Sequence, residues 1–155
     1  MDDLTTAIAR FMAIGAEAHV MRHASLKAGA ELFLEKAKAA LGTYEYGWPR
    51  LADSTLARKS HGDTPGLETG EMRDSGGYEI HGDHFIVGFS SPKIVWFEFG
   101  TKSQPPRPVV GGTIDRHGQE IANRMGVVFG MVMGEALAIG SVASAARNIL
   151  GGGFR

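Results

Sequence analysis

The first forty residues carry apolar side chains at the spacing of a helix, and this pattern constrains the fold most. Leu4, Ile8, Phe11 and Met12 lie at i, i+4, i+7 and i+8. That spacing places them on one face of an α-helix. We predict a long N-terminal helix over residues 1–42, whose last residue is a glycine, the usual residue at a helix C-terminus.

A second long helix is predicted near the other end of the chain, over residues 109–148, and the tail 149–155 is expected to be flexible. Gly15 and Gly29 are weak helix formers, so the N-terminal segment is either one bent helix or two.

Glycines recur every four residues in the second helix, at Gly126, Gly130 and Gly134. One interpretation is a membrane helix over Met125–Ala146 with a small-residue packing face. Glu135 argues against it, because a carboxylate in the middle of a span is costly. We favour a helix outside the membrane, with another helix packed closely on the glycines.

The middle of the chain, residues 43–108, is rich in turns. Segments 77–81 and 84–89 flank Gly82-Asp83, a two-residue hairpin signal. The apolar run 94–99 is a third strand or a short helix, since periodicity does not decide between them. The sequence therefore predicts one α+β domain of 155 residues: a helix, a small antiparallel sheet with a hairpin, and a helix.

Composition excludes several classes of function. The chain has no cysteine, which removes disulfides, thiolate catalysis and zinc sites with cysteine ligands. A formal net charge of −1 argues against gripping nucleic acid by bulk charge. The 22 glycines, about twice the usual share, indicate close backbone approach or loops. The first residues lack a secretory signal pattern, so synthesis in the cytoplasm is expected.

Histidines and aspartates suggest a metal site at first sight: His61, Asp63, His81, Asp83 and His84. A catalytic metal needs about three ligands converging from rigid elements. A Gly-Asp turn with polar neighbours explains the second group without an ion, so we expect no metal. A metal-dependent hydrolase using these histidines remains a rival hypothesis, as does a small membrane-active protein. A toxin-like or nucleic-acid-binding module is a weaker third.

Glu98 lies between Phe97 and Phe99 in the sequence. An isolated buried carboxylate is costly, so it needs a partner. We expect Arg107 or Arg73 to supply one, within the chain or across a subunit boundary.

Three motifs stand in a particular order: LETGEMRDS at 67–75, WFEFGT at 96–101 and PPRP at 105–108. Their order and spacing between two helices resemble the neck and tail-completion proteins of long-tailed phages, the lambda minor tail protein Z-like group. The segment 48–59 is also similar to the Mu protein G-like virion morphogenesis group. Glu68 stands where that first group often has an aspartate.

The resemblance implies a structural role with no catalysis, cofactor or metal. Such proteins form a ring at the head–tail connector, commonly of six subunits, bind other neck proteins such as a stopper, adaptor, tail terminator or tail tube, and let DNA pass without specific binding. The expected location is the virion of a phage or a phage-derived particle such as a gene transfer agent, and no membrane contact is expected. The candidate assembly residues are Gly70, Arg73, Trp96, Glu98, Phe99, Gly100, Thr101, Pro106, Arg107 and Pro108.

Overall fold

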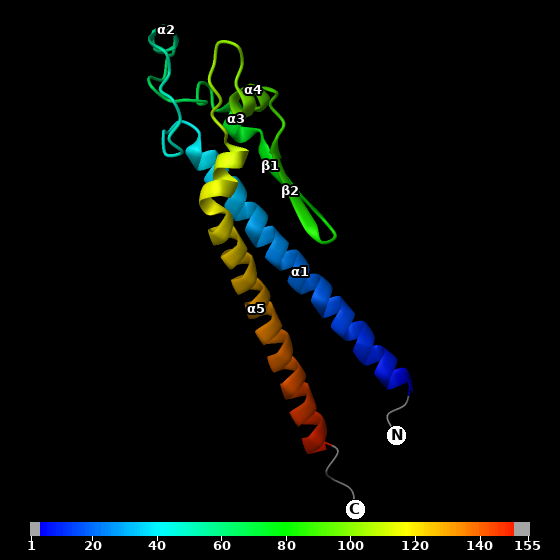
Figure 1. Ribbon diagram of the computed structural model, residues 1–155. Coiled ribbons are helices and arrows are strands. Elements are labelled where there is room, and N and C mark those ends of the chain that lie inside the picture. Colours follow the sequence, from blue (N-terminus) through cyan, green and yellow to red (C-terminus); the bar gives the residue numbers. More distant parts are fainter. Residues whose placement is uncertain (1–3, 151–155) are drawn as a thin grey trace, which may run out of the picture.

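Two long helices dominate the molecule, and the elements between them in sequence form a small head at one end (Figure 1). The computed structural model describes residues 4–150, with the side chains of residues 5, 8, 12, 13 and 15–134. The elements in chain order are α1 (Leu4–Ala40), α2 (Asp53–Leu56), α3 (Glu71–Asp74), β1 (Gly76–His81), β2 (His84–Phe89), α4 (Lys93–Phe99) and α5 (Val110–Leu150). The predicted α+β order of helix, antiparallel hairpin and helix is confirmed.

The long helices run antiparallel, so the start of α1 and the end of α5 lie at the same end of the molecule, away from the head (Figure 1). They pack together near the head and draw apart toward those ends. Ser25 marks their contact, since its hydroxyl donates a 2.8 Å hydrogen bond to the backbone oxygen of Met125.

The N-terminal segment is one helix rather than two, and Gly29 has a packing role within it. A Cβ at this position would lie 2.6 Å from the Met125 side chain and 3.3 Å from the Phe85 ring. Glycine therefore lets α5 and the hairpin both approach α1 at the same level.

The hairpin forms where the sequence places it. β1 and β2 pair antiparallel with His81 opposite His84, and Gly82 has a positive φ of 57°. A two-residue turn with glycine first suits the twist of the flanking strands. Burial alternates along β1 and along β2 as far as Val87, and the half-buried side chains lie on the face toward α1: Tyr78, Ile80, Phe85, Val87 and Phe89.

The run 94–99, which the sequence left as strand or helix, is the helix α4. Pro92 precedes it with a helical φ of −63°, and Gly100 follows it with a φ of 73°. Proline at the start and glycine at the end are the usual boundaries of a helix.

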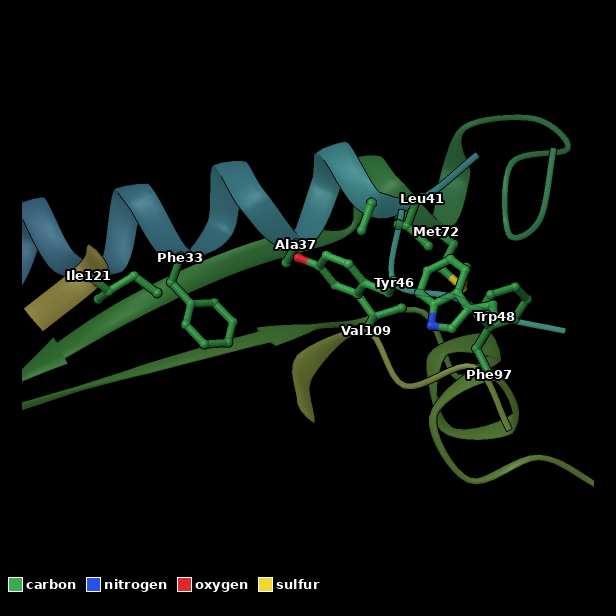
Figure 2. Close-up of a cluster of buried hydrophobic side chains, with 10 residues drawn as sticks. Phe33, Ala37, Leu41, Tyr46, Trp48, Met72, Phe97, Val109 and Ile121 are labelled. Atoms are coloured by element: carbon green, nitrogen blue, oxygen red, sulfur yellow. The ribbon is translucent and has the colours of Figure 1, made fainter. Parts of the chain in front are cut away.

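The buried core joins the head to the upper turns of α1 and α5 (Figure 2). Its members are Phe33, Ala37, Ala40, Leu41, Tyr46, Trp48, Met72, Phe97, Val109 and Ile121. Trp48 is central, with its ring centroid 5.7 Å from Tyr46 and 5.8 Å from Phe97, both edge to face. Such aromatic pairs add roughly 0.5–1.5 kcal/mol each beyond their burial.

The glycines at 126, 130 and 134 have no neighbour within 4 Å of an added Cβ. The helix predicted to pack on them is therefore not supplied by the described part of this chain. α5 continues to Leu150, two residues past its predicted end, and residues 151–155 of the predicted flexible tail lie outside the described residues. Among the described residues, no helix combines the length and apolarity that a membrane span requires.

Candidate functional site

Residues of two of the three motifs, 96–101 and 105–108, meet where the head joins α5. We call this region the junction: residues 49–50, 97–101 and 104–111. Glu98 lies at its centre. Its Oε2 accepts hydrogen bonds from the backbone nitrogens of Val109 (2.7 Å) and Val110 (3.0 Å), and its Oε1 accepts one from Gly111 (2.8 Å). The carboxylate thus caps the first turn of α5.

Within the chain, this geometry corrects the expected partner of Glu98. Neither Arg107 nor Arg73 contacts its carboxylate; backbone amides do. The first amides of a helix have no partner within it, and its N-terminus carries a partial positive charge. A carboxylate placed there satisfies three donors at once. Gly111 leaves room for it, because a Cβ there would lie 3.1 Å from Oε1.

Arg107 is buried and bonded within the chain. It is 2% exposed. Its Nε donates to the backbone oxygen of Pro49 (3.0 Å), and its Nη2 donates to that of Arg50 (3.1 Å). Its guanidinium lies 5.9 Å from the centre of the Phe97 ring. Arg107 therefore ties the segment before α5 to the segment after α1.

Gly100 and Pro106 meet in the turn that follows α4. With its φ of 73°, Gly100 has a conformation that other residues rarely adopt. A Cβ there would lie 2.7 Å from the backbone oxygen of Gln104 and 2.8 Å from the nitrogen of Pro106. The amide of Thr101 donates to the same Gln104 oxygen (2.8 Å), and the oxygen of Pro108 accepts from the Trp48 indole (3.2 Å).

Three candidate side chains point outward instead. Trp96 and Phe99 on α4 are 55% and 77% exposed, and Val95 beside them is 52% exposed. Arg73 contacts only the neighbouring Asp74 among described residues, with 3.2 Å between Nε and Oδ1. Exposed tryptophan, phenylalanine and arginine are enriched in protein interfaces.

A groove of about 710 Å³ opens between α2 on one side of the head and α3 and α4 on the other. Of the candidate residues, Gly70, Trp96 and Arg107 line it. Its other walls include Leu51, Leu67, Met72, Phe97 and Pro105, which are apolar, and Arg50, Arg58, Lys59, Lys93, Glu68 and Glu71, which are charged.

The acidic groups of the groove are paired. Lys59 Nζ lies 2.7 Å from Glu68 Oε2, and Lys93 Nζ lies 2.6 Å from Glu71 Oε2. The hydrogen bonds from these lysines lower the pKa of Glu68 and of Glu71. Both carboxylates are therefore ionised at neutral pH, and cations outnumber anions in the lining by five to two.

A polar cluster at the rim of the groove is not predictable from the sequence. The Tyr44 hydroxyl donates to Asp63 Oδ1, and Arg50 Nη2 donates to Asp63 Oδ2 (3.0 Å). These bonds lower the pKa of Asp63. No local signal in the sequence links Tyr44 with Asp63, since nineteen positions separate them.

The histidines do not converge on one point. His81 and His84 stack across the hairpin with ring centroids 5.8 Å apart, and each contacts one acid, Glu79 and Asp83 respectively. Among the described side chains, no group of three potential metal ligands comes together.

Set beside known proteins, the chain matches no family model, no curated protein and no solved structure.

Proposed function

We propose that this chain is a structural subunit of the head–tail connector of a phage or phage-derived particle, a tail-completion ring component without catalytic activity. The observation that carries the proposal is the convergence of the motifs at 96–101 and 105–108 on one junction. Glu98 from the first and Arg107 from the second fix the start of α5 and the end of the α1 connection.

The structure of the junction suits a ring subunit that must keep a fixed conformation. The junction is built from fixed backbone contacts rather than from exposed reactive groups: Arg107 is buried, and the Glu98 oxygens are occupied by three amides. The remaining motif, at 67–75, places Gly70 in the wall of the groove and Met72 in the core. A rigid junction leaves α4 and the two helices to supply contact surfaces.

The proposed partners are further copies of this chain in a ring, other neck proteins, and DNA that passes through. A formal charge of −1 supports passage rather than retention, because proteins that hold DNA neutralise phosphates with excess lysine and arginine. The outward Trp96 and Phe99 supply the kind of aromatic anchors found at protein interfaces.

Two measurements test this. Light scattering of the purified protein should give a closed oligomer, about 99 kDa for six copies of a 16.5 kDa chain. Particles made without the protein should accumulate as separate heads and tails, and adding the protein back should join them. Normal joining in its absence would refute the proposal.

A further inference from the structure

Between Met125 and Gly134, α5 has apolar side chains that the other described residues leave largely uncovered. From Met125 to Gly134 no residue is charged. Val127, Phe129, Met131 and Met133 are 39–64% exposed. A helix that is apolar on all sides is normally buried, so the described chain leaves this surface without its cover.

These residues form a groove of helical geometry. At about 100° per residue, Val127 and Met131 fall on one side and Phe129 and Met133 on the other. Gly126, Gly130 and Gly134 run between the two pairs, and Val128 and Val132 are half-buried on the opposite face, toward α1. We call the glycines with these two flanking pairs the α5 groove.

α1 carries a matching ridge on its own free half. Ile8, Met12, Ala16 and Val20 are spaced four apart and all exposed, the first, second and last by 50%, 72% and 59%. Rows of side chains four apart are the ridges that fit between similar rows of another helix. We call these four residues the α1 ridge.

We propose that the α5 groove receives the α1 ridge of a second copy of this chain. The contact joins two different faces, so repeating it from copy to copy generates a ring if the rotation closes. The inference rests on the proposed ring and names its interface.

Charge and area support this occupant. The α5 groove is uncharged, so it does not select a charged partner such as a phosphate backbone, and the four α1 ridge residues that would enter it are themselves apolar. The seven large apolar side chains of groove and ridge expose on the order of 600 Å² together. That is about two-fifths of the ~1,600 Å² that a standard interface buries, with a polar rim completing it.

Gly126, Gly130 and Gly134 are also consistent with a second copy's α1 ridge in the α5 groove. Glycine is the poorest helix former after proline, and within the described residues no neighbour within 4 Å accounts for these three. Small residues let a second helix approach closely, which a partner at the groove would use.

The absence of cysteine allows a direct test by cross-linking. Ala16→Cys and Gly130→Cys are made in separate preparations, one with a mass tag, then mixed and oxidised. Mixed covalent dimers should exceed by about tenfold those from Ala16→Cys with Lys102→Cys, an exposed loop position, because a specific contact raises the local thiol concentration.

The outcomes separate the interface from the proposed function. A ring by light scattering without excess mixed dimers overturns this contact and leaves the ring. Mixed dimers without a closed ring support the contact and refute the ring. Dimers only between two Gly130→Cys copies overturn the α1 ridge as occupant, and a monomer without cross-links overturns both proposals.

A second variant gives an independent check. Gly130→Leu fills the groove but meets open space in the subunit, so the protein should fold with an unchanged or higher Tm and lose its oligomers. Gly118→Leu is the matched control on the same helix, also without a neighbour within 4 Å of its Cβ, and should keep them. Retained oligomers in Gly130→Leu would contradict the proposal.

Discussion

Glu98 and Val109 are joined by a hydrogen bond of 2.7 Å from the Val109 backbone nitrogen to the carboxylate of a residue eleven positions earlier. Because the same carboxylate also binds the amides of Val110 and Gly111, the end of α4 fixes where α5 begins. The Glu98 side chain therefore links the head directly to the first turn of the longest helix.

Replacing Glu98 should weaken the fold. Glu98→Gln loses the charge and one acceptor oxygen, and should lower the free energy of unfolding by about 1–2 kcal/mol. Glu98→Ala, which leaves all three amides without this acceptor, should cost about 2–3 kcal/mol. Urea denaturation followed by circular dichroism measures both. Glu35→Gln, an exposed change near the C-terminal end of α1, is the control and should stay within about 0.5 kcal/mol. Equal effects of Glu98→Gln and Glu35→Gln would contradict the capping role.

Replacing Arg107 should lower the stability of the fold, so any effect on assembly should follow from that loss. Arg107→Ala leaves the oxygens of Pro49 and Arg50 without their donor and should cost about 2–4 kcal/mol. Arg107→Lys should recover only part of this, because an ammonium group lacks the planar fork that reaches two carbonyls. Arg73→Ala, on the surface beside Asp74, should change stability by less than about 0.5 kcal/mol. An unchanged Tm for Arg107→Ala would refute the assignment.

Two glycine substitutions should have opposite signs. Gly100→Ala strains a left-handed backbone and pushes against the main chain at Gln104 and Pro106, so it should destabilise by about 2 kcal/mol or more. Gly118→Ala, in the helical backbone of α5 with open space around it, should stabilise by about 0.5–1 kcal/mol. The Tm values of the two variants and of the wild type, measured under the same conditions, test these opposite signs. A neutral Gly100→Ala would show that the turn after α4 can rearrange.

Lowering the pH should remove the contribution of the Lys59–Glu68 ion pair to the stability of the fold. Lys59 lowers the pKa of Glu68 below its ordinary value of 4.5, so the pair stabilises the fold fully above that pH and loses its contribution as the pH falls through the folded pKa. Glu68→Gln should therefore lower Tm at pH 7, and the gap from the wild type should narrow below pH 4.5. Thermal denaturation at a series of pH values measures the gap. A constant gap would mean that the ion pair does not contribute.

The exposed aromatic residues of α4 should affect assembly alone. Phe99→Ser removes a side chain that is 77% exposed, so the free energy of unfolding should change by less than about 0.5 kcal/mol. If Phe99 anchors a partner, head–tail joining should fall. Phe97→Ser, its buried neighbour, should instead lower Tm strongly. Normal joining by particles with Phe99→Ser would exclude this residue from the contact.

Local patterns were enough to predict much of the fold. The two helices follow from a 3.6-residue apolar period, and the hairpin follows from Gly82-Asp83 between two alternating segments. Both signals act between near neighbours in the chain, so they are visible without tertiary structure. The type of α4 was not visible locally, because the short run 94–99, five apolar residues and Glu98, fits either a strand or a helix. In the folded chain it is a helix, with Phe97 packed against Trp48.

For the site residues too, the sequence indicated one part and the tertiary structure determined the rest. The sequence by itself indicated that Glu98 needs a partner, since burial of an isolated charge is costly anywhere, and it shows Arg107 between two prolines. Only the tertiary structure decided that backbone groups satisfy both, the α5 amides for Glu98 and the carbonyls of Pro49 and Arg50 for Arg107. The reason is physical: unpaired donors and acceptors exist at every helix end and turn, and the folded chain determines which charged side chain reaches them.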